Sequence, residues 1–507
     1  MMTAMNLNPR MNLGELLQGI IEIPAEMQRT INKPCLDSRQ IVEGDLFLAC
    51  AGHTVHGFTH IDAALEAGAT AVLWETHPDI DTLPFSWRTS PQGQQVPLIA
   101  IADLSAQVGV LADRFYGQPS RKMFVTGITG TNGKTSCSQF LAQLLSEDKP
   151  CGVIGTLGNG LYGQLNDTAH TTPDALSCHA FMADMLALGA SDIVMEVSSH
   201  ALQQGRVNAV QFDCAVFTNL SRDHLDYHGD MQAYADAKAR LFNVADLKFA
   251  VINIDDEYGR ELAKRITPPT RLIRYGLSAE SGQADIYACD VTLSPAGLSC
   301  HVVTPWGEGE LSASILGQFN VSNLLSVLSV LLLHGMTLNE ALSRLSRVKQ
   351  VAGRMECLLQ QDKPTVVIDY AHTPDALEQV LLALREHCEG QLWCVFGCGG
   401  DRDKGKRPLM GEIADRLADV IVLTNDNPRS ESPQAILNDI QTGLTGLSEC
   451  HIMADRAVAI AHAINNARAN DIVLIAGKGH EDYQLIGGQR LSFSDVVEAR
   501  KQLGLVA

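Results

Sequence analysis

Apolar runs alternate with amphipathic stretches along the whole chain, and this pattern predicts an α/β protein of three domains. We place the domains at residues 1–102, 103–348 and 349–507, since a chain of 507 residues is long enough for three at roughly 150 residues each. Because strands alternate with helices, we expect most strands to pair in parallel. The expected strands lie at residues 45–49, 71–74, 97–101, 124–127, 193–197, 214–218, 249–254, 365–369, 392–396, 420–424 and 472–476, and two expected helices lie at residues 61–67 and 134–145.

Two segments depart from this alternation. Residues 284–315 switch between apolar and polar positions around Pro-Ala-Gly and Trp-Gly turns, which predicts antiparallel hairpins attached to the second domain. Residues 324–333 are the most apolar stretch, but they are too few to cross a bilayer and include Ser326 and Ser329. We therefore expect a buried helix there.

The first 20 residues lack a basic segment followed by an apolar core, so we expect a cytoplasmic protein.

Composition and charge exclude several classes of function. The chain carries 38 Lys and Arg against 58 Asp and Glu, a net charge of −20, which argues against a general binder of nucleic acid or of anionic membranes. Thirteen cysteines are scattered without a Cys-x-x-Cys pair. Buried reduced thiols are therefore expected, rather than a metal cluster or a disulfide framework.

The clearest chemical signal is Gly-Ile-Thr-Gly-Thr-Asn-Gly-Lys-Thr at residues 127–135, between an expected strand and an expected helix. This is the context of a phosphate-binding loop, in which glycines let backbone amides approach phosphate and the helix start favours negative charge. We expect Lys134 to contact the terminal phosphates and the Thr135 hydroxyl to bind Mg²⁺. Ile128 stands where the usual pattern has its first glycine. A purely structural turn is the alternative.

Two polar residues at expected strand ends are candidate metal ligands. Glu196 ends a strand in Met-Glu-Val-Ser-Ser-His, and His224 follows another in Asn-Leu-Ser-Arg-Asp-His. A carboxylate beside a phosphate loop suits Mg²⁺, which prefers oxygen ligands, whereas histidine is a less typical ligand for it. Each residue alone would favour a structural role, but their shared position at the sheet edge favours a functional one.

Four strands of the third domain end in polar or glycine-rich segments. In open α/β sheets, ligands bind at the carboxyl ends of the strands, so these segments predict a substrate site. The segments are Tyr-Ala-His-Thr-Pro, Gly-Cys-Gly-Gly-Asp-Arg, Asn-Asp-Asn-Pro-Arg and Gly-Lys-Gly-His-Glu.

Together, Gly-Thr-Asn-Gly-Lys-Thr, Glu-Val-Ser-Ser-His, Asn-Leu-Ser-Arg-Asp-His-Leu-Asp-Tyr-His-Gly and Asp-Tyr-Ala-His-Thr-Pro-Asp-Ala resemble the motifs of the Mur ligase family. The resemblance covers essentially the whole chain. It implies a UDP-binding amino-terminal domain, a central P-loop ATPase with a parallel sheet, and a Rossmann-like carboxyl-terminal domain. It also implies ATP and Mg²⁺ as cofactors and an acyl-phosphate route to an amide bond in peptidoglycan precursor synthesis. Asp-Asn-Pro-Arg at residues 426–429 narrows the resemblance to members that add 2,6-diaminopimelate, in its meso form by family expectation, to a UDP-linked muramoyl dipeptide.

The resemblance assigns nucleotide and metal contacts. It implies that Lys238 is carbamylated, which turns a cation that repels Mg²⁺ into an anionic oxygen ligand, whereas a lone helix lysine would otherwise be solvated. The implied catalytic residues are Lys134, Glu196, His224 and Lys238, and the implied metal ligands are Thr135, Glu196, His224 and Lys238. The implied nucleotide contacts are Gly130, Thr131, Asn132, Gly133, Lys134, Thr135, Ser136, Asn320, Asn323, Arg354 and Asp369. Of these, Arg354 and Asp369 are expected to reach the nucleotide from across the domain gap.

The UDP-linked dipeptide is assigned to residues of the first two domains. His170 stands where many relatives have asparagine, which puts a side-chain amide contact there in question, and a structural role for Val55 is an equal alternative. The implied contacts are Leu36, Ser38, His53, Thr54, Val55, His170, Thr171, Thr172, Ser198, Gln204 and Arg206.

Selection of the amino acid is expected in the third domain. Diaminopimelate differs from lysine by a second carboxylate, which Arg429 can bind through two parallel hydrogen bonds. Glu481 could pair with the distal ammonium, and a surface salt bridge is the alternative role for Arg429. By resemblance the site is completed by Arg402, Asp426, Asn427, Pro428, Gly477 and Glu481.

Other functions are compatible with parts of this pattern. A folylpolyglutamate synthase-like ligase shares the phosphate loop and the chemistry, but the amino-terminal domain and Asp-Asn-Pro-Arg argue against it. A regulatory nucleotide switch leaves the substrate-type motifs of the third domain without a role. A noncatalytic scaffold leaves Lys134, Glu196 and Lys238 unexplained. We expect a monomer with small-molecule substrates and neither nucleic acid nor membrane as a partner.

Overall fold

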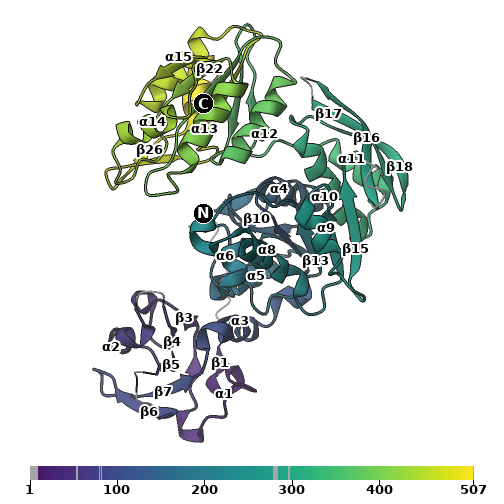
Figure 1. Ribbon diagram of the computed structural model, residues 1–507. Helices are drawn as coiled ribbons and strands as arrows, with labels where there is room; N and C mark the ends of the chain where they lie inside the picture. Colours follow the sequence, from purple (N-terminus) through teal and green to yellow (C-terminus); the bar gives the residue numbers. More distant parts are fainter. Residues whose placement is uncertain are drawn as a thin grey trace. The chain divides into compact units, whose positions relative to one another are not determined.

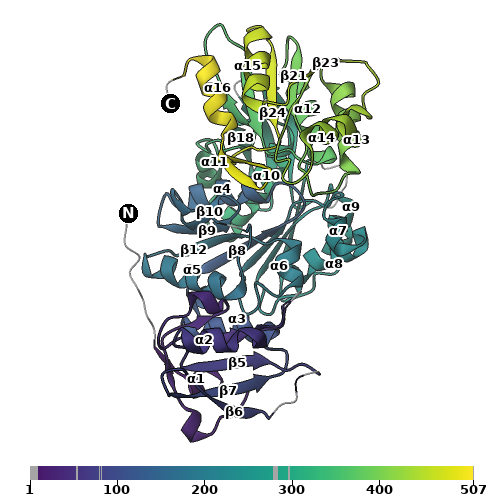
Figure 2. The same cartoon turned by 90° about the vertical axis from the view of Figure 1, so that its left-hand side faces the viewer.

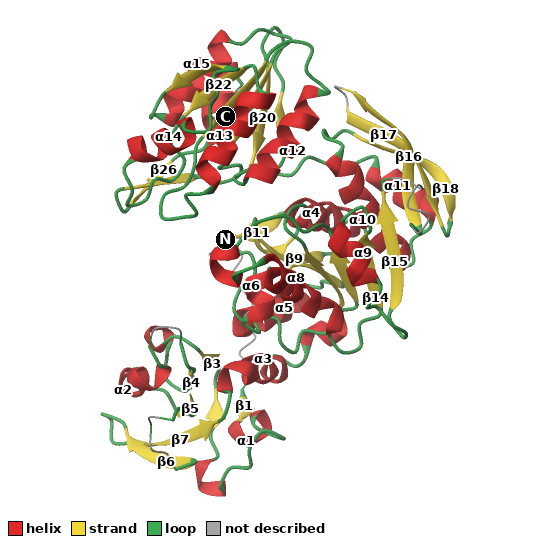
Figure 3. Ribbon diagram, in the orientation of Figure 1, coloured by secondary structure: helices red, strands yellow, loops and turns green. Residues whose placement is uncertain are grey.

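The computed structural model describes residues 10–52, 55–78, 80, 83–168, 170–277, 284–294 and 297–505. It is a mixed α/β structure, as predicted (Figure 1, Figure 3). The chain forms two compact units, and each is described by itself. The first comprises Met1–Thr129, Leu145–Ala215 and Asp236–Lys248, and the second comprises Gly130–Leu144, Val216–Ala235 and Phe249–Ala507.

The amino-terminal part of the first unit is a five-stranded sheet covered on both faces. Its strands lie in the order β3 (Pro34–Cys35), β4 (Leu46–Ala49), β5 (Ala71–Glu75), β7 (Gln95–Ile101) and β6 (Phe85–Thr89), and only β6 is antiparallel to its neighbour. Side chains alternate across the sheet. Phe47 and Val72 pack with α2 (Ile61–Glu66), whereas Leu48 and Leu73 pack with α1 (Leu13–Leu16) and α3 (Leu104–Phe115).

A second group of strands in the first unit has the order β11 (Gln164–Asn166), β10 (Gly158–Leu161), β9 (Cys151–Gly155), β12 (Asp192–Glu196) and β8 (Phe124–Thr129). Strands β9, β12 and β8 are parallel, and β10 and β11 form an antiparallel extension. The remaining elements of this unit are β1 (Met11–Asn12), β2 (Thr30–Ile31), α5 (Ala175–Ala187), α6 (Ser199–Gln203) and 3₁₀ turns at Ala25–Met27, Ser38–Gln40, Gly57–His60, Pro119–Lys122 and Arg240–Asn243. Strand β13 (Cys214–Phe217) and helix α8 (Met231–Ala239) have residues in both units.

In the second unit, β14 (Phe249–Asn253), β15 (Arg271–Gly276) and β16 (Ile286–Ser294) pair in parallel. Strands β17 (Gly297–Thr304) and β18 (Gly307–Ala313) then continue from β16 as an antiparallel meander, which confirms the predicted hairpins. Helix α10 (Phe319–Leu333) packs against β14, β15 and β16, and every residue from 323 to 333 is buried, which confirms the predicted buried helix. The other helices here are α4 (Lys134–Leu145, whose last residue belongs to the first unit), α7 (Leu225–His228), α9 (Glu257–Ala263) and α11 (Leu338–Leu345).

The carboxyl-terminal part of the second unit is a doubly wound sheet, as the Rossmann-like prediction requires. Its strands lie in the order β19 (Glu356–Leu358), β20 (Thr365–Asp369), β24 (Ile472–Ala476), β21 (Leu392–Phe396), β22 (Val420–Leu423) and β23 (Glu449–Ile452), and only β19 is antiparallel. One face packs against α12 (Pro374–Arg385), α13 (Lys406–Leu417) and α14 (Pro433–Gln441), and the other against α15 (Arg456–Asn466) and α16 (Asp495–Leu503) (Figure 2). The hairpin β25 (Tyr483–Ile486) and β26 (Gln489–Ser492) follows β24.

All thirteen cysteines are free, and eight of them are buried, so the expectation of reduced, mostly buried thiols is confirmed. Burial raises the pKa of the Cys398 thiol to about 12, whereas Cys450 is exposed.

None of the helices in the described part of the chain has both the length and the apolar character that a bilayer crossing requires.

Adjacent leucines in α12 allow a direct test of this packing. Leu381 is fully buried against the carboxyl-terminal sheet, whereas Leu382 is 43% exposed. We expect Leu381→Ala to lower the free energy of unfolding by about 2–5 kcal/mol, because the substitution leaves a cavity. Leu382→Ala, the matched control, should cost less than about 1 kcal/mol. Urea denaturation followed by circular dichroism measures both values, and equal losses would contradict the packing.

Candidate active site

The phosphate loop connects β8, which ends at Thr129, to α4, which begins at Lys134. Two of its positions require glycine. The φ angle is +151° at Gly130 and +85° at Gly133, a range that L-residues rarely adopt. A Cβ at Gly130 would lie 1.9 Å from Thr218 Oγ1, and one at Gly133 would lie 2.6 Å from Asn323 Oδ1. The loop is therefore packed too closely for any side chain at these positions.

Residues 218–221 hold the loop in this conformation. The Thr131 amide donates to the Asn219 carbonyl at 2.9 Å, and the Asn132 amide donates to Asn219 Oδ1 at 2.9 Å. In return, Thr218 Oγ1 donates to the Asn132 carbonyl at 2.6 Å. Hydrogen bonds in both directions fix the backbone, so the loop is preorganised for a ligand.

The ammonium of Lys134 folds back over the phosphate loop. Its Nζ donates to the carbonyl oxygens of Gly130 and Thr131, at 2.8 Å each. The cation therefore lies against the segment whose backbone amides would bind phosphate.

Three further predicted nucleotide residues are brought to this loop within the second unit. Asn323 lies against Gly133 and donates from Nδ2 to Asn320 Oδ1 at 2.9 Å. Arg354 donates from Nη2 to Thr135 Oγ1 at 3.2 Å, and its guanidinium lies 4.5 Å from the centre of the Tyr370 ring. Residues more than 200 positions apart thus meet at the start of α4.

Asp369 braces the segment that carries Arg354. Its Oδ2 accepts from the Met355 amide at 2.7 Å, and its Oδ1 accepts from the Ala371 amide at 2.8 Å. Burial raises the pKa of the Asp369 carboxyl, and the charge of Arg354 opposes that shift. Both carboxylate oxygens thus bind backbone amides, which positions the neighbouring Arg354.

His224 is the N-cap residue just before α7, with a left-handed φ of +54°, and its side chain is about half exposed. Its Nε2 lies 3.4 Å from Asp223 Oδ2. Burial alone would raise the pKa of Asp223, but the charges of His224, His372 and Lys134 and the hydrogen bond from the His224 amide together hold that pKa below its usual range. The segment therefore keeps an anionic carboxylate beside the imidazole.

Glu196 ends β12 in the first unit and is fully buried. Its Oε1 accepts from the Thr156 amide at 2.9 Å, and its Oε2 accepts from Thr156 Oγ1 at 3.1 Å. Lys238, on α8, is only 1% exposed. Both residues thus have the burial expected of candidate metal ligands.

Five predicted substrate residues assemble around the end of β12. Thr172 Oγ1 donates to the Glu196 carbonyl at 2.8 Å and accepts from the Ser198 amide at 3.1 Å. Arg206 donates from Nη1 to the Thr172 carbonyl at 2.9 Å and from Nε to Gln204 Oε1 at 2.9 Å. Thr171 joins the cluster through Thr156, since their hydroxyl oxygens lie 3.0 Å apart.

The other predicted contacts of the UDP-linked substrate are more scattered. His170 is exposed, on the segment just before Thr171. Leu36 packs against the core of the amino-terminal sheet, Ser38 begins a 3₁₀ turn, and Val55 is 51% exposed. His53 and Thr54 lie outside the described residues.

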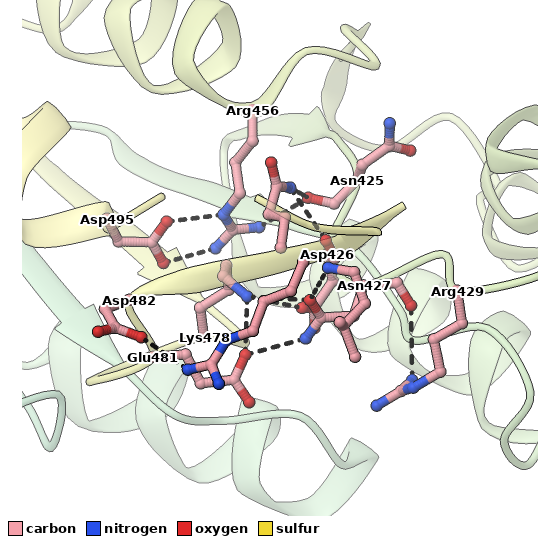
Figure 4. A network of polar contacts seen from close by, with 12 residues as sticks. Asn425, Asp426, Asn427, Arg429, Arg456, Lys478, Glu481, Asp482 and Asp495 are labelled. Carbon is pink, nitrogen blue, oxygen red and sulfur yellow. Dashed lines mark hydrogen bonds and ion pairs between the residues drawn. The ribbon is translucent and has the colours of Figure 1, made fainter. Parts of the chain in front are cut away.

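Two predicted segments meet at the carboxyl ends of the strands of the carboxyl-terminal sheet (Figure 4). Asp426 and Asn427 follow β22, and Glu481 follows β24. Asn427 Nδ2 donates to Glu481 Oε2 at 2.9 Å. Gly477, with a φ of +114°, lets the backbone pass Asp426 Oδ2, because a Cβ there would lie 3.1 Å from this oxygen.

Lys478 joins these acidic side chains and is fully buried. Its Nζ donates to Glu481 Oε2 at 2.7 Å and to Asn427 Oδ1 at 3.3 Å. It also lies 3.7 Å from Asp426 Oδ1, a buried atom with no hydrogen-bond partner among the described residues. The Glu481 carboxylate, which the sequence predicted to bind a substrate ammonium, is thus already paired with a lysine of the protein.

Arg429 lies on the same loop with a left-handed φ of +52°. Its amide donates to the Leu485 carbonyl at 2.9 Å, so the loop is anchored to β25. Its Nη1 donates to the Gly400 carbonyl at 2.8 Å. Within the described ranges, Nη2 has no hydrogen-bond partner, which leaves that edge of the guanidinium for a ligand. Pro428 is buried beside it, and Arg402 is exposed.

The sequence did not predict Thr156, Lys478 or Asp375 as site residues. Asp375 accepts from Asn132 Nδ2 at 3.0 Å and from Ser221 Oγ at 2.9 Å. Lys478 and Asp375 both occur in or directly after strand-end motifs, so strand-end position was a usable signal for them. Thr156 follows β9 in an unremarkable Gly-Thr-Leu sequence and had none.

Comparisons with known proteins agree with the motif pattern. Family models match at residues 31–116 (Mur ligase family, catalytic domain), 128–331 (Mur ligase middle domain) and 353–479 (Mur ligase, glutamate ligase domain).

Two curated relatives have the name UDP-N-acetylmuramoyl-L-alanyl-D-glutamate–2,6-diaminopimelate ligase. The protein of Coxiella burnetii (strain RSA 493 / Nine Mile phase I) is 50% identical over 473 residues, which cover 92% of this chain and 94% of the relative. The protein of Pseudomonas aeruginosa (strain PAO1) is 49% identical over 480 residues, which cover 94% and 96%. A solved structure described by the same ligase name is similar with a TM-score of 0.69 and 37% identity, covering 97% of this chain and 99% of that one.

The close approach at Gly133 generates a test of the phosphate loop. We expect Gly133→Ala to weaken ATP binding at least about tenfold, since the added Cβ displaces either Asn323 or the loop. Gly335→Ala is the matched control, because Gly335 also has a positive φ of +104° but a Cβ there would meet no atom within 4 Å. Isothermal titration with ATP measures both variants, and equal affinities would contradict a loop that depends on this contact.

Proposed function

The chain belongs to the Mur ligase family, and on that premise we propose that it is the ATP-dependent ligase that joins meso-2,6-diaminopimelate to UDP-N-acetylmuramoyl-L-alanyl-D-glutamate. The observation that carries this proposal is the Asp426–Arg429 loop, held beside Lys478 and Glu481 at one edge of the carboxyl-terminal sheet. This arrangement offers a guanidinium edge and paired carboxylates to a zwitterionic amino acid. The similarity to ligases of that name over more than nine-tenths of the chain supports the same substrates.

The reaction accounts for the phosphate loop. The free carboxylate of the UDP-linked dipeptide takes the terminal phosphoryl group of ATP and becomes an acyl phosphate, with release of ADP. The amino group of diaminopimelate then attacks the acyl carbon, loses a proton, and expels phosphate to leave an amide bond. Both steps increase negative charge on phosphate oxygens, which the amides of the loop and the Lys134 ammonium stabilise.

As Mg²⁺ ligands we propose the residues that the resemblance implies, namely Thr135 and His224 in the second unit and Glu196 and Lys238 in the first. The donor set fits the ion, because a hydroxyl, a fully buried carboxylate and a carbamate are hard oxygen ligands. When bound, Mg²⁺ neutralises the charge of the phosphates. Thr156 holds Glu196 by both carboxylate oxygens and so orients it.

We assign the dipeptide part of the UDP-linked substrate to the cluster at the end of β12. Its hydroxyl groups and the guanidinium of Arg206 are suited to binding carboxylate and amide oxygens. Its members are Thr171, Thr172, Ser198, Gln204 and Arg206, with His170 at its exposed margin. The uridine contacts at Leu36, Ser38, His53, Thr54 and Val55 stay predictions, as do the three domain boundaries, the cytoplasmic location and the monomeric state.

Charge in the carboxyl-terminal site favours the distal end of diaminopimelate. Asp426 and Glu481 face one lysine, Lys478, so the three side chains keep one net negative charge when all are ionised. That charge complements the distal ammonium, while Arg429 complements the distal carboxylate. Lysine would leave the Arg429 guanidinium without its anion.

The proposed function is tested by supplying ATP, Mg²⁺ and the UDP-linked dipeptide with diaminopimelate, with lysine, or with neither. We expect stoichiometric ADP, phosphate and a ligated product of the expected mass with diaminopimelate, and little product with lysine. Equal product with lysine, or no product with either amino acid, would overturn the proposal.

Arg429 gives the sharpest prediction about specificity. Arg429→Ala should lower kcat/KM for diaminopimelate about 10²–10³-fold, because breaking a buried charge pair costs about 3–5 kcal/mol. Arg429→Lys should recover little, because an ammonium cannot reproduce two parallel hydrogen bonds. Lysine should stay a poor substrate in both variants. An unchanged preference for diaminopimelate in Arg429→Ala would show that its second carboxylate is bound elsewhere, with Arg402 as the next candidate.

A further inference from the structure

We propose that Arg456, held by Asp495, is a positioning residue that fixes the amino-acid site by tying together the ends of β22 and β24. The inference rests on the proposed function for its meaning, since these two strand ends carry the residues assigned to diaminopimelate. Neither Arg456 nor Asp495 belongs to the motifs that identified the site.

The two side chains form a buried ion pair between the first residues of α15 and α16. Both side chains have no solvent exposure. Arg456 Nε donates to Asp495 Oδ1 and Nη2 donates to Asp495 Oδ2, at 2.7 Å each. This bidentate geometry fixes the plane of the guanidinium (Figure 4).

The fixed guanidinium donates to two strand ends. Nη2 donates to the carbonyl of Ala476, the last residue of β24, at 2.9 Å. Nη1 donates to the carbonyl of Asn425, just beyond β22, at 3.3 Å. The residues that follow these carbonyls are Gly477 and Asp426, so each hydrogen bond lies one residue from the proposed substrate site.

A bridge is needed here because β22 and β24 are not neighbours. Strand β21 lies between them and pairs with both. Strands separated by one other strand are about 10 Å apart, so the two strand ends cannot hydrogen-bond to each other directly. Backbone hydrogen bonds join the two segments only further along, where Arg429 meets Leu485 and Gly487. Arg456 reaches both ends from the helical layer. It thereby fixes the strand ends from which Asp426 on one side and Lys478 and Glu481 on the other project, in addition to the direct contacts among these side chains.

Stability alone does not account for this pair. Removing two charges from water is costly, and apolar residues of similar volume often stabilise a core equally well or better. Apolar side chains, however, cannot donate to the carbonyls of Asn425 and Ala476. Gln484 assists from β25, donating to the Asp426 carbonyl at 3.0 Å, so the β22 end is held from two directions.

The test replaces both charges together, so that neither is left buried and unpaired. We expect Arg456→Met with Asp495→Leu to fold with a Tm close to that of the wild type. Its KM for diaminopimelate should rise about tenfold, because the two segments of the site lose their common tether. The KM values for ATP and for the UDP-linked dipeptide should change less than about twofold, since their assigned contacts lie elsewhere.

A matched control removes a buried arginine away from this site. Arg344 on α11 donates to Glu340 Oε1 at 2.6 Å and to the Leu144 carbonyl at 2.8 Å. Arg344→Met with Glu340→Gln should leave the KM for diaminopimelate unchanged. Arg456→Lys keeps the charge beside Asp495 but loses the planar guanidinium and its two parallel hydrogen bonds. We expect its KM for diaminopimelate to lie between those of the wild type and the double variant.

Amide hydrogen exchange provides a readout that needs no substrate. Residues 425–429 and 476–481 should exchange about tenfold faster in the Arg456→Met, Asp495→Leu variant than in the wild type and the control. A folded double variant with unchanged exchange in these segments would overturn the inference, as would an unchanged KM for diaminopimelate. Failure of the wild type to use diaminopimelate would instead refute the proposed function, while the exchange data would still decide the role of Arg456.

Discussion

The parallel pairing of β20, β24, β21 and β22 is the constraint on which the amino-acid site depends. Parallel strands carry their carboxyl ends to one edge of a sheet, so segments more than 100 residues apart in sequence meet there. The pairing is possible because both faces of these strands are covered by helices, which lets every residue of β21 and β24 be apolar. The parallel pairing of apolar strands therefore accounts both for the burial of the sheet and for the assembly of the site.

This origin explains why much of the fold was predictable. Strands β20, β21 and β24 and helix α4 begin and end at the predicted residues, because continuous apolar runs or a glycine-rich turn delimit them. Strand β8 extends two residues further than predicted, since Ile128 and Thr129 are also buried. Strands β6, β23 and β26 were not predicted. Most of their side chains are at least partly exposed, so their pairing depends on neighbouring strands rather than on an apolar pattern.

The site was predictable where a motif is contiguous and unpredictable where contacts are long-range. The phosphate loop and the cluster of Thr172, Ser198 and Arg206 come from short segments with characteristic residues. By contrast, Arg456 meets Asp495 across 39 positions, with no local pattern around either residue. The structure also alters the interpretation of Glu481. Glu481 is already paired with Lys478, which also lies near Asp426. A substrate ammonium would therefore interact with this group of three charged side chains and not with an unpaired Glu481 carboxylate.

The contact between Gly133 and Asn323 has an evolutionary consequence. Asn323 cannot readily retreat from the loop, because its Nδ2 is bound to Asn320 and its Oδ1 accepts from Cys137 Sγ at 3.4 Å. A larger residue at position 133 would therefore need a smaller one at position 323, almost 200 residues away, and would still have the backbone strain of a φ of +85°. The two positions are thus epistatically coupled, and the backbone conformation at position 133 gives a second, independent reason for glycine to persist there.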